Sequence, residues 1–147
     1  MKIEKILLYI EPKINIESIS QFTLNLARQN NARVFALSII PHPQPQVKTR
    51  SDEQAWKRLY EIEEDAFEAG IKISLLLEEL EKLSRDNLTQ KLIDLSKSFR
   101  VDVIVFSSTS RININKLNGE INLPIIIIPP QPISKAQEKN KVTQWEV

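Results

Sequence analysis

Residues 101–130 read VDVIVFSSTSRININKLNGEINLPIIIIPP and carry the clearest fold signal in the chain. The apolar runs at 103–106 and 125–128 are β-branched and do not alternate, which is typical of parallel strands buried on both faces. A hydroxyl-rich loop, residues 107–110, follows the first run. Ligands of open α/β sheets usually bind beyond such strand ends, where a phosphate-binding loop normally carries glycines. The open question is whether this serine-rich loop still holds a nucleotide.

The rest of the chain alternates between short apolar runs and amphipathic segments. Further strands are predicted at 6–10, 34–40 and 71–77, with helices between them and before the fourth strand. Strands that alternate with helices imply right-handed crossovers and a mostly parallel sheet. We therefore predict an α/β, Rossmann-like fold with an open, mostly parallel five-stranded sheet flanked by helices. The segment 107–124 contains Gly119 and has little room for a full crossover, so the fourth helix should be shortened or absent.

Local signals indicate where the helices begin and end. Ser18 or Ser20 is predicted to cap the first helix, and Asp86 or Asn87 the third. Gly70 should end the second helix, because glycine adopts the left-handed conformation without a steric penalty. The charged residues 78–85 are predicted to form a loop or a short helical turn.

Composition narrows the class of protein. The 147 residues predict one domain at 1–130 and a flexible C-terminal tail at 131–147, in which Trp145 is either an incidental exposed aromatic or a docking anchor. A net charge of +1 gives no general attraction to nucleic acid or membrane, and we expect neither as a partner. The absence of cysteine excludes disulfides, thiolate metal sites and cysteine nucleophiles. Without an apolar run of membrane-spanning or signal-peptide character, a cytoplasmic location is the expectation.

The last strand is reached without a long crossover, so it is expected at an edge of the sheet. An open edge of four isoleucines, Ile125–Ile128, favours aggregation unless something covers it. Association with a second copy of the chain is one way to cover such an edge. We therefore predict a homodimer through this strand.

With its elements in this order, the chain resembles the universal stress protein family over nearly its whole length, the tail excluded. Residues 6–27 (ILLYIEPKINIESISQFTLNLA) align without a gap with that family's first strand and helix, and residues 32–43 (ARVFALSIIPHP) resemble its second strand and following loop. Residues 102–111 (DVIVFSSTSR) resemble its fourth strand and phosphate loop, and residues 123–128 (LPIIII) its last strand. The resemblance implies a five-stranded parallel sheet of the adenine nucleotide α-hydrolase type, a common homodimer and, in one branch, ATP bound at the strand ends.

The chain departs from the family's ATP-binding pattern. Members that bind ATP carry Gly-x-x-Gly, nine residues and Gly-Ser or Gly-Thr, but the first two glycine positions are Ser107 and Ser110 here, and Gly119 lies one residue early for the third. A serine forced into left-handed geometry costs about 1–2 kcal/mol, which weakens phosphate binding. The acid that faces adenosine in that family corresponds to Glu11, one methylene longer than the usual Asp. The candidate cofactor-binding residues are Glu11, Ile40, Ser107, Ser108, Ser110, Arg111 and Gly119.

These residues favour an interaction protein over an enzyme. The chain has one histidine, His42, which lies between prolines, and no base or nucleophile supports an α-hydrolase activity. The first hypothesis is a stress-response-type regulatory or interaction protein that binds an unidentified protein partner, needs no cofactor and does not bind ATP in the family's usual way. The alternative is a sensor module that binds ATP or AMP through Glu11, Arg111 and the loop after the fourth strand.

Overall fold

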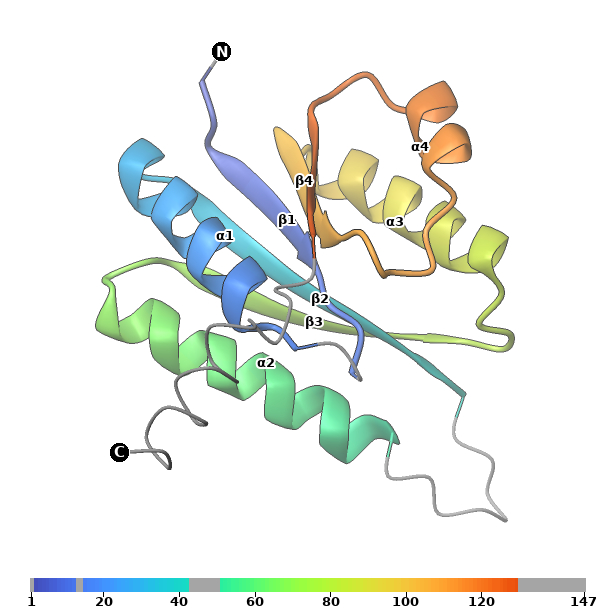
Figure 1. Cartoon of the computed structure of the whole chain (residues 1–147), viewed down its shortest axis with the longest axis horizontal. Coiled ribbons are helices and arrows are strands. Elements are labelled where there is room, and N and C mark those ends of the chain that lie inside the picture. Colours follow the sequence, from blue (N-terminus) through green and yellow to red (C-terminus); the bar gives the residue numbers. More distant parts are fainter. Residues whose placement is uncertain (1, 13–14, 43–50, 130–147) are drawn as a thin grey trace, which may run out of the picture.

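One parallel sheet organises the chain (Figure 1). A computed structural model describes residues 2–12, 15–42 and 51–129; the predicted tail and Trp145 lie outside these ranges. The five strands, in the sheet order β3-β2-β1-β4-β5, are β1 (Lys5–Tyr9), β2 (Arg33–Pro41), β3 (Ile73–Leu80), β4 (Val103–Ser107) and β5 (Ile125–Ile128). The helices are α1 (Glu17–Asn30), α2 (Ser51–Glu68), α3 (Arg85–Phe99) and α4 (Ile114–Glu120). The predicted α/β fold is confirmed, and every strand pair is parallel.

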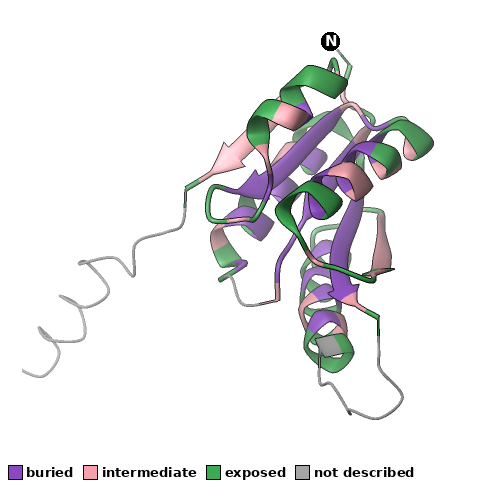
Figure 2. Ribbon diagram, turned by 90° about the vertical axis from the view of Figure 1, so that its right-hand side faces the viewer, coloured by how far each residue is buried: buried purple, intermediate pink, exposed green. Residues whose placement is uncertain are grey.

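Helices cover both faces of the sheet. On one face, Ile6 and Leu8 of β1 pack in a core cluster with residues of α1 and α2, such as Leu59. On the other face, Leu7 packs with residues of α3 and α4, such as Leu92. Figure 2 shows the central strands buried between helices whose outer faces are exposed. The unbroken apolar run of β1 is therefore explained, because its alternate residues enter two separate cores.

β1 lies at the centre of the sheet although it is the first strand in the sequence. It pairs with β2 on one side and with β4 on the other. Asp102, just before β4, accepts the backbone N–H groups of Glu4 and Lys5 at 2.8 and 2.9 Å. The start of β1 is thus fixed by a residue from the last third of the chain.

β5 forms one edge of the sheet, and β3 forms the other. Only seven residues of helix, α4, lie between β4 and β5, so the predictions of a shortened fourth helix and of an edge position for the last strand are confirmed. The four isoleucines of β5 are half-buried. Since the carbonyls of Pro124 and Ile128 accept hydrogen bonds from the β4 side, the backbone groups of Ile125 and Ile127 face outward.

The start of α1 differs from the predicted one. The helix begins at Glu17, and the N-cap residue, Ile16, has no side-chain cap. The carboxamide oxygen of Asn15 accepts the Glu17 N–H at 3.0 Å instead. Ser18 and Ser20, the predicted caps, therefore lie inside the helix, and their buried hydroxyls have no hydrogen-bond partner among the described residues. The prediction is wrong because a polar side chain earlier in the chain already reaches the first turn.

The predicted cap of α3 is wrong for the same reason. Ser84 is the N-cap, and its hydroxyl accepts the N–H of Asn87 at 3.1 Å. Asp86 and Asn87 therefore belong to the first turn of the helix, where the negative charge of Asp86 suits the helix dipole.

The helix ends follow the expected stereochemistry. Gly70 has a φ of 71° just after α2, which confirms its predicted role. α1 and α3 end on Asn31 and Arg100, which adopt the left-handed conformation without being glycines. β3 runs to Leu80, so residues 78–80 are strand and not the predicted loop or turn, because the long β2 pairs with β3 as far as Pro41. None of the helices within the described ranges is long and apolar enough to cross a bilayer.

Candidate functional site

A pocket of about 490 Å³ opens at the carboxyl ends of β1 and β2. This is the edge at which ligands of open α/β sheets usually bind, and the volume lies within the usual range for small-molecule sites. Its walls combine apolar side chains with a few polar ones. The lining residues are Tyr9, Glu11, Pro12, Ile39, Ile40, Pro41, Gln54, Leu83 and Arg111.

Glu11 is the central polar group of this pocket, and it is buried. Its Oε1 accepts the backbone N–H of Arg111 at 2.7 Å, and its Oε2 lies 3.6 Å from the Arg111 Nε. The Tyr9 hydroxyl donates a longer hydrogen bond to Oε1, at 3.4 Å. A buried carboxylate needs such partners, and here the chain itself supplies them. A ligand that used Glu11 would therefore compete with Arg111.

Tyr9 is a neutral hydrogen-bond donor beside this carboxylate. Burial and, second, the negative charge of Glu11 raise the pKa of the Tyr9 phenol far above its ordinary value of 10.0. The positive charge of Arg111 lowers this pKa, but burial and Glu11 prevail. The phenol therefore keeps its proton near neutral pH and donates a hydrogen bond.

The loop after β4 uses its own backbone N–H groups internally. Residues 108–111 each donate their N–H within the protein, in order to the Ile128 carbonyl, the Ser107 hydroxyl, the Ser107 carbonyl and the Glu11 carboxylate. The donor–acceptor distances are 2.9, 3.3, 2.9 and 2.7 Å. Phosphate-binding loops turn several free N–H groups toward the anion. In this conformation, the N–H groups of 108–111 are not available for that purpose.

The serines of this loop avoid the left-handed conformation. In the described part of the chain, the non-glycine residues with positive φ are Asn31 and Arg100. The loop instead closes as a tight turn, in which the Ser110 N–H reaches the Ser107 carbonyl. The strain expected from serines at glycine positions does not arise, because the backbone takes a different path.

Three of the seven predicted site residues line the pocket together, namely Glu11, Ile40 and Arg111. Three others do not line the pocket: Ser107, the last residue of β4, and Ser108 and Ser110 in the loop after it. Gly119 lies on the exposed surface of α4, where an added Cβ would meet no atom within 4 Å. The structure therefore assembles the carboxylate end of the predicted site and leaves the predicted phosphate end outside the pocket.

The remaining lining residues do not belong to the predicted site. Tyr9 and Ile39 could be found from the sequence, because alternate residues near the ends of predicted neighbouring strands share a face. Gln54 and Leu83 come from the start of α2 and from the segment before α3. Only tertiary folding brings them to the strand ends, so no sequence pattern indicates their role.

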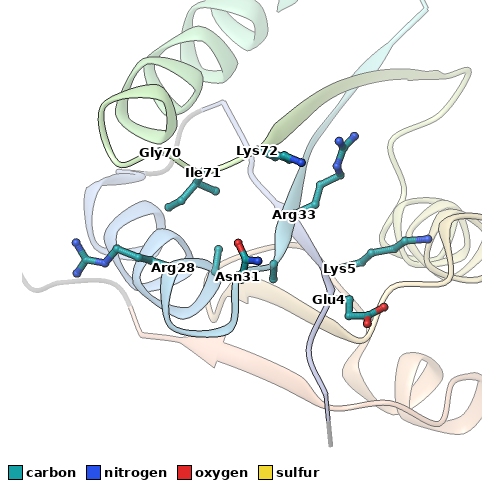
Figure 3. A pocket seen from close by; sticks show the side chains of 10 residues that line it. Glu4, Lys5, Arg28, Asn31, Arg33, Gly70, Ile71 and Lys72 are labelled. Carbon is teal, nitrogen blue, oxygen red and sulfur yellow. The ribbon is translucent and has the colours of Figure 1, made fainter.

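A second pocket, of about 370 Å³, lies at the opposite, amino-terminal edge of the strands. Figure 3 shows its lining side chains, among which Arg28 and Lys5 point away from each other. The Lys5 ammonium donates to the Phe99 carbonyl at the end of α3, at 3.1 Å. Cations stabilise helix C-termini, and α1, α2 and α3 all end at this edge. The Lys5 ammonium therefore serves the end of α3, and the guanidinium groups of Arg28 and Arg33 hydrogen-bond to Asn25 and Ser74.

His42 takes part in a surface ion pair. Its Nδ1 lies 3.1 Å from Glu79 Oε2, and both side chains are exposed. Such pairs contribute little to stability. Within 2–12, 15–42 and 51–129, no group of His, Asp and Glu side chains could hold a metal ion.

The fold is similar to that of solved universal stress proteins. A protein of that family from Burkholderia pseudomallei superposes with a TM-score of 0.70 over 87% of this chain and 97% of its own, at 16% identity. The Archaeoglobus fulgidus universal stress protein in complex with dAMP gives 0.66 over 87% and 99%, at 18% identity. A family protein from Arabidopsis thaliana with AMP bound gives 0.62 over 90% and 98%, at 15% identity. No family profile and no curated protein matches the sequence, so the resemblance expected from the sequence is confirmed at the level of the fold.

Proposed function

We propose that this chain is a regulatory or interaction protein of the universal stress protein type, acting in the cytoplasm without enzymatic activity. It does not bind ATP in the manner of the family's ATP-binding branch. The observation that carries this proposal is the internal bonding of the N–H groups of residues 108–111. At roughly 1 kcal/mol for each hydrogen bond, releasing two of them would weaken phosphate binding more than tenfold.

The alternative is a nucleotide-responsive module that uses the pocket at the ends of β1 and β2. The pocket's volume and its mixture of apolar walls with Glu11 and Arg111 favour this second function. The fold is shared with proteins whose structures hold dAMP and AMP. In this alternative, the hydroxyls of the loop after β4 and the Arg111 guanidinium would contact phosphate in place of backbone N–H groups.

Calorimetry and thermal shift with ATP and AMP, with and without Mg²⁺, separate the two functions. We expect no saturable response at millimolar nucleotide. A ligand at a hundred times its dissociation constant would instead stabilise the fold by about 2.7 kcal/mol. Gln54→Trp provides a test of location, because Gln54 lines the pocket from an exposed helix position. Gln21→Trp, at an exposed position of α1 that does not line the pocket, is the matched control.

The two outcomes are clearly different. Saturable binding that Gln54→Trp abolishes and Gln21→Trp preserves would establish the nucleotide-responsive module and remove the first proposal. No response to either nucleotide in the wild-type chain would remove the alternative.

The predicted homodimer belongs to the same proposal. Its support is the edge position and half-buried isoleucines of β5, whose backbone groups at Ile125 and Ile127 face away from β4 and pair with no other described strand. Light scattering at high micromolar concentration should give twice the monomer mass for the wild-type chain and the monomer mass for Ile127→Pro. Leu77→Pro is the matched control, since Leu77 occupies an outward backbone position on the other edge strand, β3. A wild-type monomer at that concentration would exclude the dimer.

A further inference from the structure

The outer face of α2 carries two aromatic side chains that lie outside both described core clusters, Tyr60 and Phe67, beside Trp56, which packs partly against one of these clusters. Phe67 is 84% exposed and Tyr60 is 55% exposed, while Leu59 and Ile62 on the inner face are fully buried. Trp56 stacks on Tyr60 with ring centroids 5.5 Å apart. Large aromatic side chains in water have a marked tendency to bury themselves against a partner.

These aromatics line a groove together with the start of β3. The groove has a volume of about 450 Å³, and its apolar lining comes from Tyr60, Phe67, Ile71 and Ile73. It continues into a shallower hollow that also contains Trp56 and shares Tyr60 with the groove. We call these five residues the α2 strip. Because Trp56, Tyr60 and Phe67 are four and seven residues apart, they lie along one face of the helix, over about 17 Å.

The surroundings of the α2 strip are acidic. The carboxylates that line the groove and the hollow are those of Asp52, Glu53, Glu61, Glu63 and Glu64. Among the described residues that line them, Lys57 is the one cation. A second copy of the chain would bring an equally acidic surface to this face, which like-charge repulsion disfavours. Charge complementarity therefore favours a basic partner.

We propose that the α2 strip binds a basic amphipathic helix of another protein, with aliphatic side chains on its inner face and Lys or Arg at its flanks. The proposal deepens the interaction function proposed above and takes from it only the premise that the chain acts by binding a macromolecule. A helix fits the strip because its apolar residues at i, i+3, i+4 and i+7 match the spacing along α2 and the groove beside it. Phe67 and Tyr60 are the expected anchors, since exposed aromatics in grooves commonly dominate interface energies.

The test uses the full chain and an 18-residue probe peptide of leucine and lysine, with leucine on one helical face. A peptide of the same pattern with glutamate in place of lysine is the charge control. Calorimetry measures affinity, and amide chemical-shift changes locate the contact. We expect the lysine peptide to bind at α2 and the start of β3, and the glutamate peptide not to bind.

Two variants and a matched control identify the anchors. Phe67→Ala and Tyr60→Ala should each weaken peptide binding by about tenfold. Phe22→Ala removes an exposed aromatic from α1 instead, and it should leave the affinity unchanged. Circular dichroism checks the fold of each variant; Phe67 is so exposed that its loss should leave the fold intact.

A second pair of variants tests the charge argument. The double variant Glu63→Gln/Glu64→Gln removes two carboxylates that line the groove and should weaken peptide binding. The control double variant, Asp94→Asn/Glu120→Gln, removes two exposed charges from other helices and should weaken binding less. The proposal is overturned if the two aromatic variants bind the peptide within about twofold of wild type. Shifts outside α2 and β3, or self-association through the α2 strip, would also overturn it. Saturable nucleotide binding would overturn the proposed function and would not affect the peptide result. If the lysine peptide does not bind, this inference is overturned and the proposed function is not.

Discussion

The hydrogen bond from the Arg111 N–H to the Glu11 carboxylate, at 2.7 Å, is expected to be a main stabilising contact of the pocket. Glu11→Ala leaves this partly buried N–H without its acceptor. A hydrogen bond to a charged group contributes about 1.5–3 kcal/mol, so we expect a loss of about 2–3 kcal/mol in the free energy of unfolding. In a domain of this size, that loss lowers the melting temperature by roughly 6–12 °C.

Two further variants separate the backbone contact from the ion pair. Glu11→Gln keeps an oxygen acceptor without its charge and should cost about 1 kcal/mol. Arg111→Met keeps the N–H and removes the guanidinium, whose side chain is 51% exposed and lies 3.6 Å from Glu11. Because exposed ion pairs contribute little, its cost should stay below about 1 kcal/mol.

Urea unfolding monitored by circular dichroism gives the order of these three losses. Amide hydrogen exchange adds a local measurement, since protection of the Arg111 N–H should fall in Glu11→Ala and persist in Arg111→Met. The reasoning is refuted if Arg111→Met destabilises the chain as much as Glu11→Ala. A loss below about 0.5 kcal/mol in Glu11→Ala would refute it equally, because a hydrogen bond to a charged group contributes more than that.

Three other changes have defined outcomes. Burial raises the folded-state pKa of Tyr9, so the stability that its protonated phenol contributes is complete below pH 10 and is lost above pH 10 at about 1.4 kcal/mol per pH unit. The urea midpoint of Tyr9→Phe should therefore fall less steeply above pH 10 than that of wild type. Equal slopes would contradict this, and Tyr60→Phe is the control. Ser20→Ala should raise the free energy of unfolding by about 0.5 kcal/mol in urea titrations, since the buried hydroxyl has no hydrogen-bond partner in the described part of the chain and alanine favours the helix; a loss would show that the hydroxyl has a role. Ser84→Ala should lower the melting temperature through a loss of about 1 kcal/mol at the α3 cap, and Ser84→Asp should restore most of it.

Much of the fold can be predicted because its signals are local. The apolar runs of β1 and β4 lack alternation, and the structure buries them on both faces. Gly70 ends α2 by a rule that needs no tertiary information. The helix caps are harder, because Asn15 and Ser84 compete with later polar residues for the same N–H groups, and the sequence does not indicate which oxygen reaches them.

The candidate site is only partly predictable, because part of it depends on contacts between residues far apart in the sequence. Glu11 and Ile40 lie at or just after predicted strand ends, so their place at the carboxyl edge follows from the fold class. The internal hydrogen bonds of the loop after β4 do not follow from the fold class, since their acceptors include the Ile128 carbonyl of β5 and the Glu11 carboxylate, 100 residues away in the sequence. Whether a loop's N–H groups are free depends on such distant contacts, and residue types alone do not reveal it.

The central place of β1 exposes the growing chain to a hazard during synthesis. β1 is the first strand to leave the ribosome. Its neighbour on one side, β4, which pairs Val103 with Ile6, is made much later. At roughly 5–20 residues per second, that side of the strand stays open for several seconds. An apolar strand with an open edge is a template for pairing between chains. Lys2 and Glu4 before β1 and Lys5 at its start are the kind of charged residues that discourage such pairing. A nascent chain stalled before β4 is therefore the form of this protein most in need of a chaperone.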